Sequence, residues 1–303
     1  MKETNKTKSK AIKTASILGV IGNLLLLIIK GTVGFTTHSR SMIADTFNSA
    51  GDVFSSIMTF IGNKIASKPK DQDHNLGHGK AEYIYSMLIS IAMLLMGFEV
   101  LGNSLKSLIE KTNYDFSIWL IIVCIVTIII KLFLYIYTNK LYKKYNNLLL
   151  EANAKDHRND CLITVLNLVA CLCSQIGIYI IDGIVGTIIS IWIMISAIQI
   201  FIKSYDVLMD KSLDDKTLKK VRNIIARHKE IKRVTHLNST PVGYRYQISF
   251  TIYVNGNLTT FESHEIADNL EKEIDKELPE IYLTVIHVNP IEIKKKGGKI
   301  CKQ

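Results

Sequence analysis

Cysteine is scarce in this chain of 303 residues, and the few cysteines form no pattern. They are five in number and widely scattered, so they do not indicate a disulfide framework. Zinc-finger spacing is also missing, as is any basic motif interleaved with aromatic residues. These absences argue against nucleic-acid binding, despite a formal net charge of +10. Four cysteines lie in apolar stretches, where cysteine is usually a small filler, and one lies in the tail: Cys124, Cys161, Cys171, Cys173 and Cys301.

The chain is 48% hydrophobic and yet 21% charged, which indicates that apolar and charged residues are segregated. Its first two thirds hold long apolar runs, and the remainder is charged. We therefore predict a basic tail over residues 1–13, a membrane domain over 14–204, a cytoplasmic domain over 205–290 and a second basic tail over 291–303.

The apolar runs are each long enough to cross a bilayer, which takes about 20 residues. We predict an α-helical membrane protein with six transmembrane helices, at about 14–36, 41–66, 82–105, 117–137, 149–177 and 183–202. Within the fourth span Lys131 is expected near the end that adjoins the basic loop at 139–145.

Lysine and arginine predict the orientation of the spans. They are abundant in the N-terminal tail, in the loops at 67–80 and 139–145 and in everything after Lys203, and they are sparse in the other loops. Positive residues accumulate on the cytoplasmic side. The sequence therefore predicts a multi-pass protein of a plasma membrane, with both termini in the cytoplasm and the spans surrounded by lipid.

The last third alternates helical and strand-like patterns. Two amphipathic segments, at 212–231 and 261–278, have apolar residues at helical spacing. The segments at 233–243, 244–254 and 282–290 resemble strands. The predicted order is helix, strand, strand, helix, strand, and two helices on one face of a small sheet form an α+β domain.

Acidic and amide side chains inside two of the apolar runs carry the functional argument. Asp45, Asn48 and Asp52 share one helix face, and Asp156 and Asp160 are spaced i, i+4 in the fifth span. Carboxylates inside a membrane are costly and need a partner. If the two helices pack together, Asn48, Asp52, Asp156 and Asp160 form an oxygen cage for a divalent cation. The alternative is that these acids pair with helix ends and nearby lysines.

The ligand types bear on which metal would bind. An all-oxygen set suits manganese, magnesium or calcium better than zinc or copper, although intrinsic affinity still favours zinc over manganese. We expect His157 to turn away from the cage toward the helix exterior, and Asp45 to be an accessory residue one turn nearer the outside.

Two further groups contain histidine. Asp71, His74 and His78 lie in a glycine-containing loop and could bind a zinc-like ion, with Asp73 as a possible substitute. Ordinary solvated loop residues are the alternative. The second group, near Glu262 and Asp268, could meet within the soluble domain or across a dimer interface, or could be unconnected surface residues: His236, His264 and His287.

Together these motifs resemble the cation diffusion facilitator family over about residues 12–290. The segments that carry the resemblance are SMIADTFNSAGDV, DQDHNLGHGKAE, KDHRNDC and SYDVLMDKSLDD, in that order. The resemblance implies a homodimeric exporter with six spans and a ferredoxin-like cytoplasmic domain. It also implies antiport of divalent metal against protons by alternating access.

The resemblance also assigns residues. It places Asn48, Asp52, Asp156 and Asp160 in the family's transport site. Many zinc-transporting members have histidine at the position of Asp156, so the set here is similar to the manganese-exporting branch. Further, it matches Asp71, His74 and His78 to the loop metal site, Lys80 and Asp210 to a dimer charge pair, and His236, His264 and His287 to the C-terminal metal site.

The chain departs from the family pattern in the C-terminal site. Ser249 and Asn289 stand where zinc-transporting members often have histidine and aspartate. A full binuclear site is therefore not expected, and one weaker regulatory ion is the remaining prediction.

The predicted function is manganese/proton antiport, with Mn²⁺ as transported ion and no bound cofactor. A zinc, iron or broad-range exporter of the same family is the alternative. An intramembrane metalloenzyme would need a nearby general base or nucleophile, and no such residue is clearly placed on the shared face. A metal sensor with a mere membrane anchor would not need acids inside its spans.

Overall fold

The computed structural model describes residues 2–37, 40–109, 118–175, 180–243 and 245–291. The chain divides into two compact units, Met1–Leu208 and Met209–Gln303. The first unit consists of helices and the second combines helices with a sheet.

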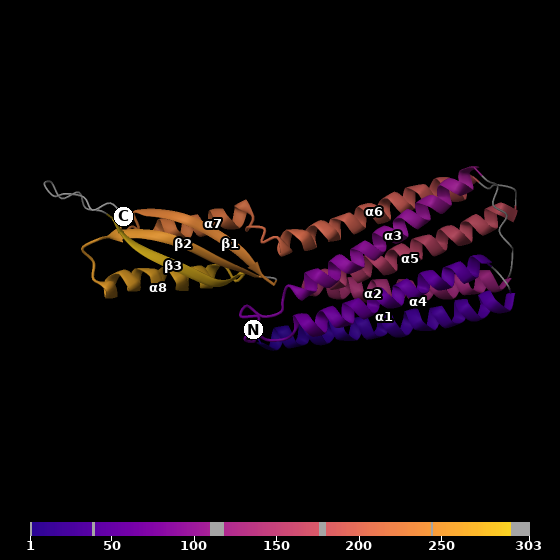
Figure 1. The fold of residues 1–303 in the computed structure, drawn as a ribbon, viewed down its shortest axis with the longest axis horizontal. Coiled ribbons are helices and arrows are strands. Elements are labelled where there is room, and N and C mark those ends of the chain that lie inside the picture. Colours follow the sequence, from indigo (N-terminus) through magenta and orange to yellow (C-terminus); the bar gives the residue numbers. More distant parts are fainter. Residues whose placement is uncertain (1, 38–39, 110–117, 176–179, 244, 292–303) are drawn as a thin grey trace. The chain divides into compact units, whose positions relative to one another are not determined.

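The long helices of the first unit, α1 to α6, lie lengthwise beside one another (Figure 1). Packing is closest between α3 and α6, between α1 and α2 and between α4 and α5. The helices are α1 (Lys2–Thr37), α2 (Arg40–Ala66), α3 (Ala81–Ile109), α4 (Ile118–Tyr145), α5 (Leu148–Gln175) and α6 (Ile180–Leu208).

The first unit has its polar side chains inside and many apolar ones outside. Large apolar residues cover its outer faces, among them Ile21, Leu95, Ile129, Phe133 and Trp192. Its buried residues include many serines, asparagines and aspartates. Water would reverse this distribution, whereas hydrocarbon accepts the apolar faces and the bundle interior satisfies the polar groups.

Four of the described helices contain segments long and apolar enough to cross a membrane. These segments are Thr7–Val33, Ala81–Lys106, Ile121–Tyr145 and Gly186–Leu208. They belong to α1, α3, α4 and α6, while the described parts of α2 and α5, which are comparably long, contain no such segment. The unit is therefore a helical membrane domain with four clear apolar spans.

Two helix bounds differ from those that the sequence suggested. Helix α1 begins at Lys2 and so includes most of the stretch predicted as a tail. Helix α4 continues to Tyr145, through the segment predicted as a loop. The chain turns at Asn146, which has φ 45°, and the Asn147 side chain then accepts a hydrogen bond from the Leu150 N–H at the start of α5.

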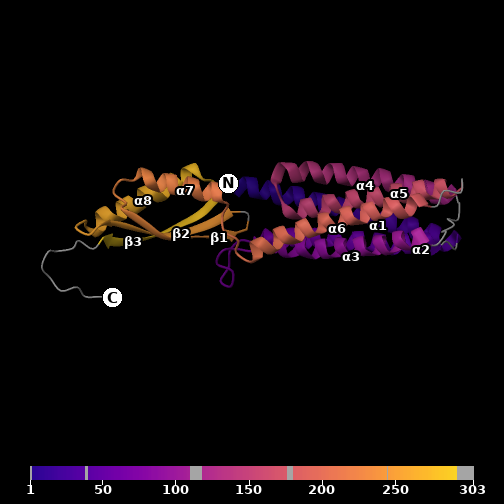
Figure 2. The same cartoon turned by 90° about the horizontal axis from the view of Figure 1, so that it is seen from above.

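The second unit has the predicted order of elements: α7 (Asp215–Arg227), β1 (Arg233–Val242), β2 (Arg245–Asn255), α8 (Thr260–Glu277) and β3 (Ile281–Ile291). The sheet order is β1-β2-β3, with β1 antiparallel and β3 parallel to β2. Both helices cover one face of the sheet (Figure 2). Their buried residues, such as Ile224 and Leu270, pack against Ile248 and Ile252 of β2.

Capping fixes where both helices of the second unit begin. Asp214 accepts a hydrogen bond from the Thr217 N–H at the start of α7. Thr259 and Glu262 form a reciprocal capping box at the start of α8. Hydrogen bonds from Thr217 and Thr259 accordingly hold the pKa of Asp214 and that of Glu262 below their usual ranges.

Candidate metal centre

Three carboxylates from two helices meet in the interior of the helical unit. Asp52 of α2 and Asp156 and Asp160 of α5 each place one oxygen within 4.8 Å of the others. Their residues are 3%, 1% and 8% exposed, respectively. The i, i+4 spacing of Asp156 and Asp160 puts both on the face of α5 that meets α2. The predicted pairing of these two helices through their acids is therefore present in the structure.

The other predicted members of this site lie on α2. Asn48 is one turn before Asp52, and Asp45 is a further turn away. Both backbones are helical, and both side chains lie outside what the structure describes. Their roles as ligand and accessory residue remain predictions.

Lys131 of α4 lies at the same centre, so two of the acids do pair with a nearby lysine, as the alternative interpretation of the sequence expected, although it did not single out Lys131. Its Nζ donates hydrogen bonds to Asp52 Oδ2 at 2.6 Å and to Asp160 Oδ2 at 2.5 Å, and the residue is 1% exposed. The expectation that Lys131 lies near the end of its span was wrong, because α4 extends to Tyr145 and Lys131 falls near its middle. A lysine in the middle of an apolar helix needs an acidic partner, and that signal was present in the sequence.

Several oxygen atoms around the carboxylates remain available to a ligand. Asp52 Oδ1, Asp156 Oδ2 and Ser49 Oγ are buried and have no hydrogen-bond partner. Asn23 of α1 donates to the Asp52 carbonyl and to Ser56 Oγ, while its own Oδ1 is also unpartnered. Buried polar atoms without partners are rare and call for an explanation such as a missing ion. The donor atoms here are all oxygens, which hard divalent cations prefer.

His157 corrects another expectation. It is completely buried, and neither ring nitrogen has a hydrogen-bond partner. A Cβ built on Gly19 of α1 would lie 3.7 Å from His157 Nε2, so the ring faces the interface with α1. The prediction that His157 lies at the helix exterior was wrong. Helix α1 covers this side of α5, which appears outward when α5 is considered alone.

A second group lies in the loop between α2 and α3. Asp71 Oδ1 is 3.3 Å from His74 Nδ1, and Asp71 Oδ2 is 3.4 Å from His78 Nε2. The two imidazole centroids are 4.4 Å apart. Gly77, with φ +82°, permits the turn that returns the chain toward Asp71. Among the described residues, this group and the buried carboxylates are the only clusters suited to a metal, and Asp73 belongs to neither.

The ionised form of the Asp71 carboxylate is stabilised by a backbone hydrogen bond from His74. The His74 N–H donates to Asp71 Oδ1 at 2.7 Å. This backbone hydrogen bond is the main reason why the pKa of Asp71 lies below its ordinary value, with further contributions from His74 and His78. Asp71 is therefore ionised through the neutral and mildly acidic range, and its role as a ligand remains a prediction.

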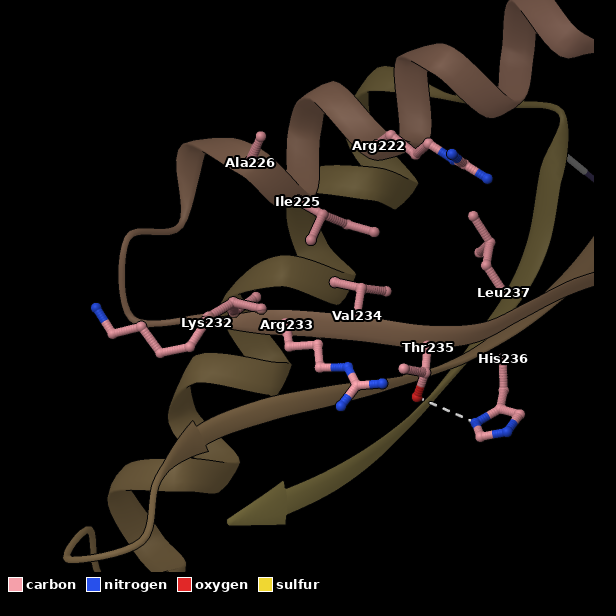
Figure 3. A pocket seen from close by; sticks show the side chains of 10 residues that line it. Arg222, Ile225, Ala226, Lys232, Arg233, Val234, Thr235, His236 and Leu237 are labelled. Atoms are coloured by element: carbon pink, nitrogen blue, oxygen red, sulfur yellow. Dashed lines mark hydrogen bonds between the residues drawn. The ribbon is translucent and has the colours of Figure 1, made fainter. Parts of the chain in front are cut away.

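The three histidines predicted for the C-terminal site do not gather in one chain. All are exposed, and none belongs to a metal-sized cluster of the described residues. His236 lies at the rim of a pocket of about 460 Å³, with its Nδ1 3.1 Å from Thr235 Oγ1 (Figure 3). His264 is 3.8 Å from Asp268, and His287 pairs with Thr251 across β2 and β3. A site shared between protomers stays a prediction.

The two residues of the predicted dimer charge pair each lie next to the end of a long helix. Lys80 immediately precedes α3, and Asp210 follows α6 within the second unit. Asp210 has φ 56°, a left-handed conformation that aspartate tolerates better than most residues. Their pairing between protomers remains a prediction.

Comparison with known proteins gives matches along nearly the whole chain. The cation efflux transmembrane domain matches residues 16–209, and the cytoplasmic domain of cation efflux proteins matches residues 213–291. The manganese efflux system protein MneP of Bacillus subtilis is 27% identical over 92% of this chain and 96% of its own length.

Two other relatives extend the comparison. The cation-efflux pump FieF of Shewanella oneidensis is 26% identical over 93% of this chain and 95% of its own length. An uncharacterized transporter of Methanocaldococcus jannaschii is 28% identical over 93% of this chain and all of its own. With the match of the transmembrane domain and the buried acidic centre between α2 and α5, the chain belongs to the cation diffusion facilitator family of cation efflux transporters.

Proposed function

We propose that this protein exports manganese in exchange for protons, working as a homodimer in the plasma membrane. In this proposal all six long helices cross the bilayer, both termini are cytoplasmic and the second unit is a ferredoxin-like domain. The observation that carries it is the buried group formed by Asp52, Asp156 and Asp160. An all-carboxylate group inside a membrane bundle needs a cation, and hydration cannot replace it there.

The charge of the group suits a cation. With all groups ionised, the three carboxylates carry more negative charge than is offset by the Lys131 ammonium and by the buried Lys30, which also acts on Asp160 electrostatically. The remaining negative charge favours binding of a cation. After the ion has left, protons that bind the same oxygens would keep the group from remaining charged in a low-dielectric interior. Alternating access then exposes the site first to the cytoplasm and next to the outside, with the two ions moving in opposite directions.

Manganese is preferred over zinc on the chemistry of the donors. The group offers oxygen atoms and lacks both thiolate and imidazole among its clustered members. This composition suits manganese and reduces the advantage that nitrogen and sulfur ligands give to zinc. Relatives named as manganese efflux proteins support the same choice. A zinc, iron or broad-range exporter is the second candidate, since FieF is named only as a cation-efflux pump.

Transport into sealed vesicles tests this function. Purified protein is reconstituted, a pH gradient is imposed and Mn²⁺ flux is recorded, with Zn²⁺, Fe²⁺ and Co²⁺ in parallel. Asp160→Ala is expected to reduce Mn²⁺ flux to the level of protein-free vesicles, because the cage loses one of its three clustered carboxylates. Asp275→Ala, on an exposed position of α8, is the matched control and should retain flux.

Two results would contradict the proposal. Near-normal Mn²⁺ flux in vesicles with Asp160→Ala would show that the clustered carboxylates do not take part in transport. Wild-type Mn²⁺ flux that does not change when the pH gradient is collapsed would show that transport is not coupled to protons. Faster flux of Zn²⁺ or Fe²⁺ than of Mn²⁺ would instead favour the second candidate.

A further inference from the structure

The Lys131 ammonium occupies oxygens that a transported cation would need. It bonds Asp52 Oδ2 and Asp160 Oδ2, and so joins α4 to both helices of the metal centre. At 1% exposure it is buried among the helices. An ammonium and a divalent metal repel each other strongly at such short range, especially where the dielectric constant is low. Both cannot hold these two oxygens at once.

We propose that Lys131 is a tethered counter-ion, which fills the transport site between cargo ions and which the incoming metal displaces. This inference rests on the proposed transport function and adds a residue to it. The lysine side chain is long and flexible, so its ammonium can withdraw along α4 without leaving the bundle. Metal entry is then an exchange of one cation for another at the same carboxylates.

The exchange of Lys131 for the metal would reduce the energetic cost of the buried carboxylates when no metal is bound. After release, the carboxylates of Asp52, Asp156 and Asp160 stand together in the bundle interior. A buried charge without a partner costs several kcal/mol, and breaking a buried pair is strongly destabilising. Lys131 supplies a partner for Asp52 and Asp160 from within the protein, which leaves Asp156 as the carboxylate that a proton would neutralise. By competing for the same oxygens it also lowers affinity for the metal, which favours release.

Two substitutions of Lys131 give opposite expectations. Lys131→Met keeps the length and removes the charge, so Mn²⁺ no longer has a competitor. Its dissociation constant for Mn²⁺ should fall by about tenfold or more, since a hydrogen bond to a charged group is worth roughly 1.5–3 kcal/mol. Lys131→Arg keeps the charge and offers a planar fork that grips carboxylates in two places. Its affinity for Mn²⁺ should be weaker than that of the wild type.

The experiment measures Mn²⁺ binding by calorimetry and metal-free thermal unfolding on the full chain in detergent, at one fixed pH. Metal-free Lys131→Met should unfold at a lower temperature than the wild type, and adding Asp160→Asn should recover part of that loss. Lys203→Met is the matched control, because Lys203 bonds Glu151 at 2.8 Å near the start of α5, outside the cluster. Its affinity for Mn²⁺ should equal that of the wild type.

The outcomes separate this inference from the proposed function. If Lys131→Met binds Mn²⁺ no more tightly than the wild type, or Lys131→Arg no more weakly, displacement is overturned. If metal-free Lys131→Met is as stable as the wild type, the counter-ion role is overturned. If the wild type binds no divalent cation, the proposed function and displacement by metal both fail, while the stability comparison still decides the counter-ion role.

Discussion

Asp156 is the residue at which the proposed preference for manganese can be tested with a single substitution. It is 1% exposed and has an unpartnered carboxylate oxygen facing the cluster. Replacing it with histidine exchanges an oxygen donor for an imidazole nitrogen, which zinc prefers. Asp156→His should therefore reduce Mn²⁺ flux and raise the ratio of Zn²⁺ to Mn²⁺ flux by about tenfold.

Vesicle flux assays with both metals measure that ratio. Asp156→Asn is the control, since it keeps an oxygen donor and removes the charge. It should slow both metals without changing their ratio. An unchanged ratio in Asp156→His would show that Asp156 does not determine the choice of metal.

The surroundings of Lys131 and His157 could not be predicted from the residue pattern of a single helix. The i, i+4 spacing of Asp156 and Asp160 is a property of one helix, so the sequence sufficed to pair them. The partners of Lys131 are on α2 and α5, and the side of His157 is covered by α1. These are relations between helices, which no local spacing contains.

The loop between α2 and α3 is the element whose own site can be tested separately. Asp71→Asn should weaken binding of Zn²⁺ to this loop by about tenfold, because one charged ligand of three is lost. Asp73→Asn is the control, since Asp73 lies outside the cluster. Calorimetry on the Asp160→Ala background isolates the loop, and equal affinities of the two variants would contradict the assignment.

The lowered pKa of Asp71 determines the pH range over which this one carboxyl group is charged. A carboxylate whose pKa is lowered in the folded state stabilises the fold fully at pH values above its ordinary pKa. This stabilisation is lost as the pH falls through the lowered pKa. Asp71 should thus remain ionised at pH values near the ordinary 3.8.

At the scale of elements, the sequence predicted the helices and strands better than their ends. Continuous apolar runs identify α1, α3, α4 and α6, and alternation identifies the strands. The polar residues 139–145 suggested a loop, yet α4 retains its helix there and ends at Tyr145. Polarity shows where a helix meets water, whereas Asn146 and Asn147 determine where this helix ends and the next begins.

At the scale of the whole molecule, the proposed dimer can be tested through its charges. Lys80→Asp would place two acids where the family resemblance pairs Lys80 with Asp210. An exposed ion pair contributes up to about 1 kcal/mol and a symmetric dimer contains two of them, so the dimer dissociation constant should rise by about 4- to 25-fold.

Light scattering of the purified chain measures the dimer fraction over a dilution series. The double variant Lys80→Asp with Asp210→Lys restores opposite charges and should recover the wild-type constant. A double variant as weak as Lys80→Asp alone would mean that these two residues do not pair.

The polarity of α2 and α5 has a consequence for how the chain is made. Neither contains a segment apolar enough to be recognised alone among the described spans, yet each packs closely on the helix that precedes it in the sequence. Charged residues make insertion of a single helix unfavourable. Lys131 and Asp160 lie on consecutive helices and bond each other. Helices α4 and α5 can therefore enter the bilayer as one hairpin in which Lys131 already pairs with Asp160, so two members of the buried acidic centre are inserted together.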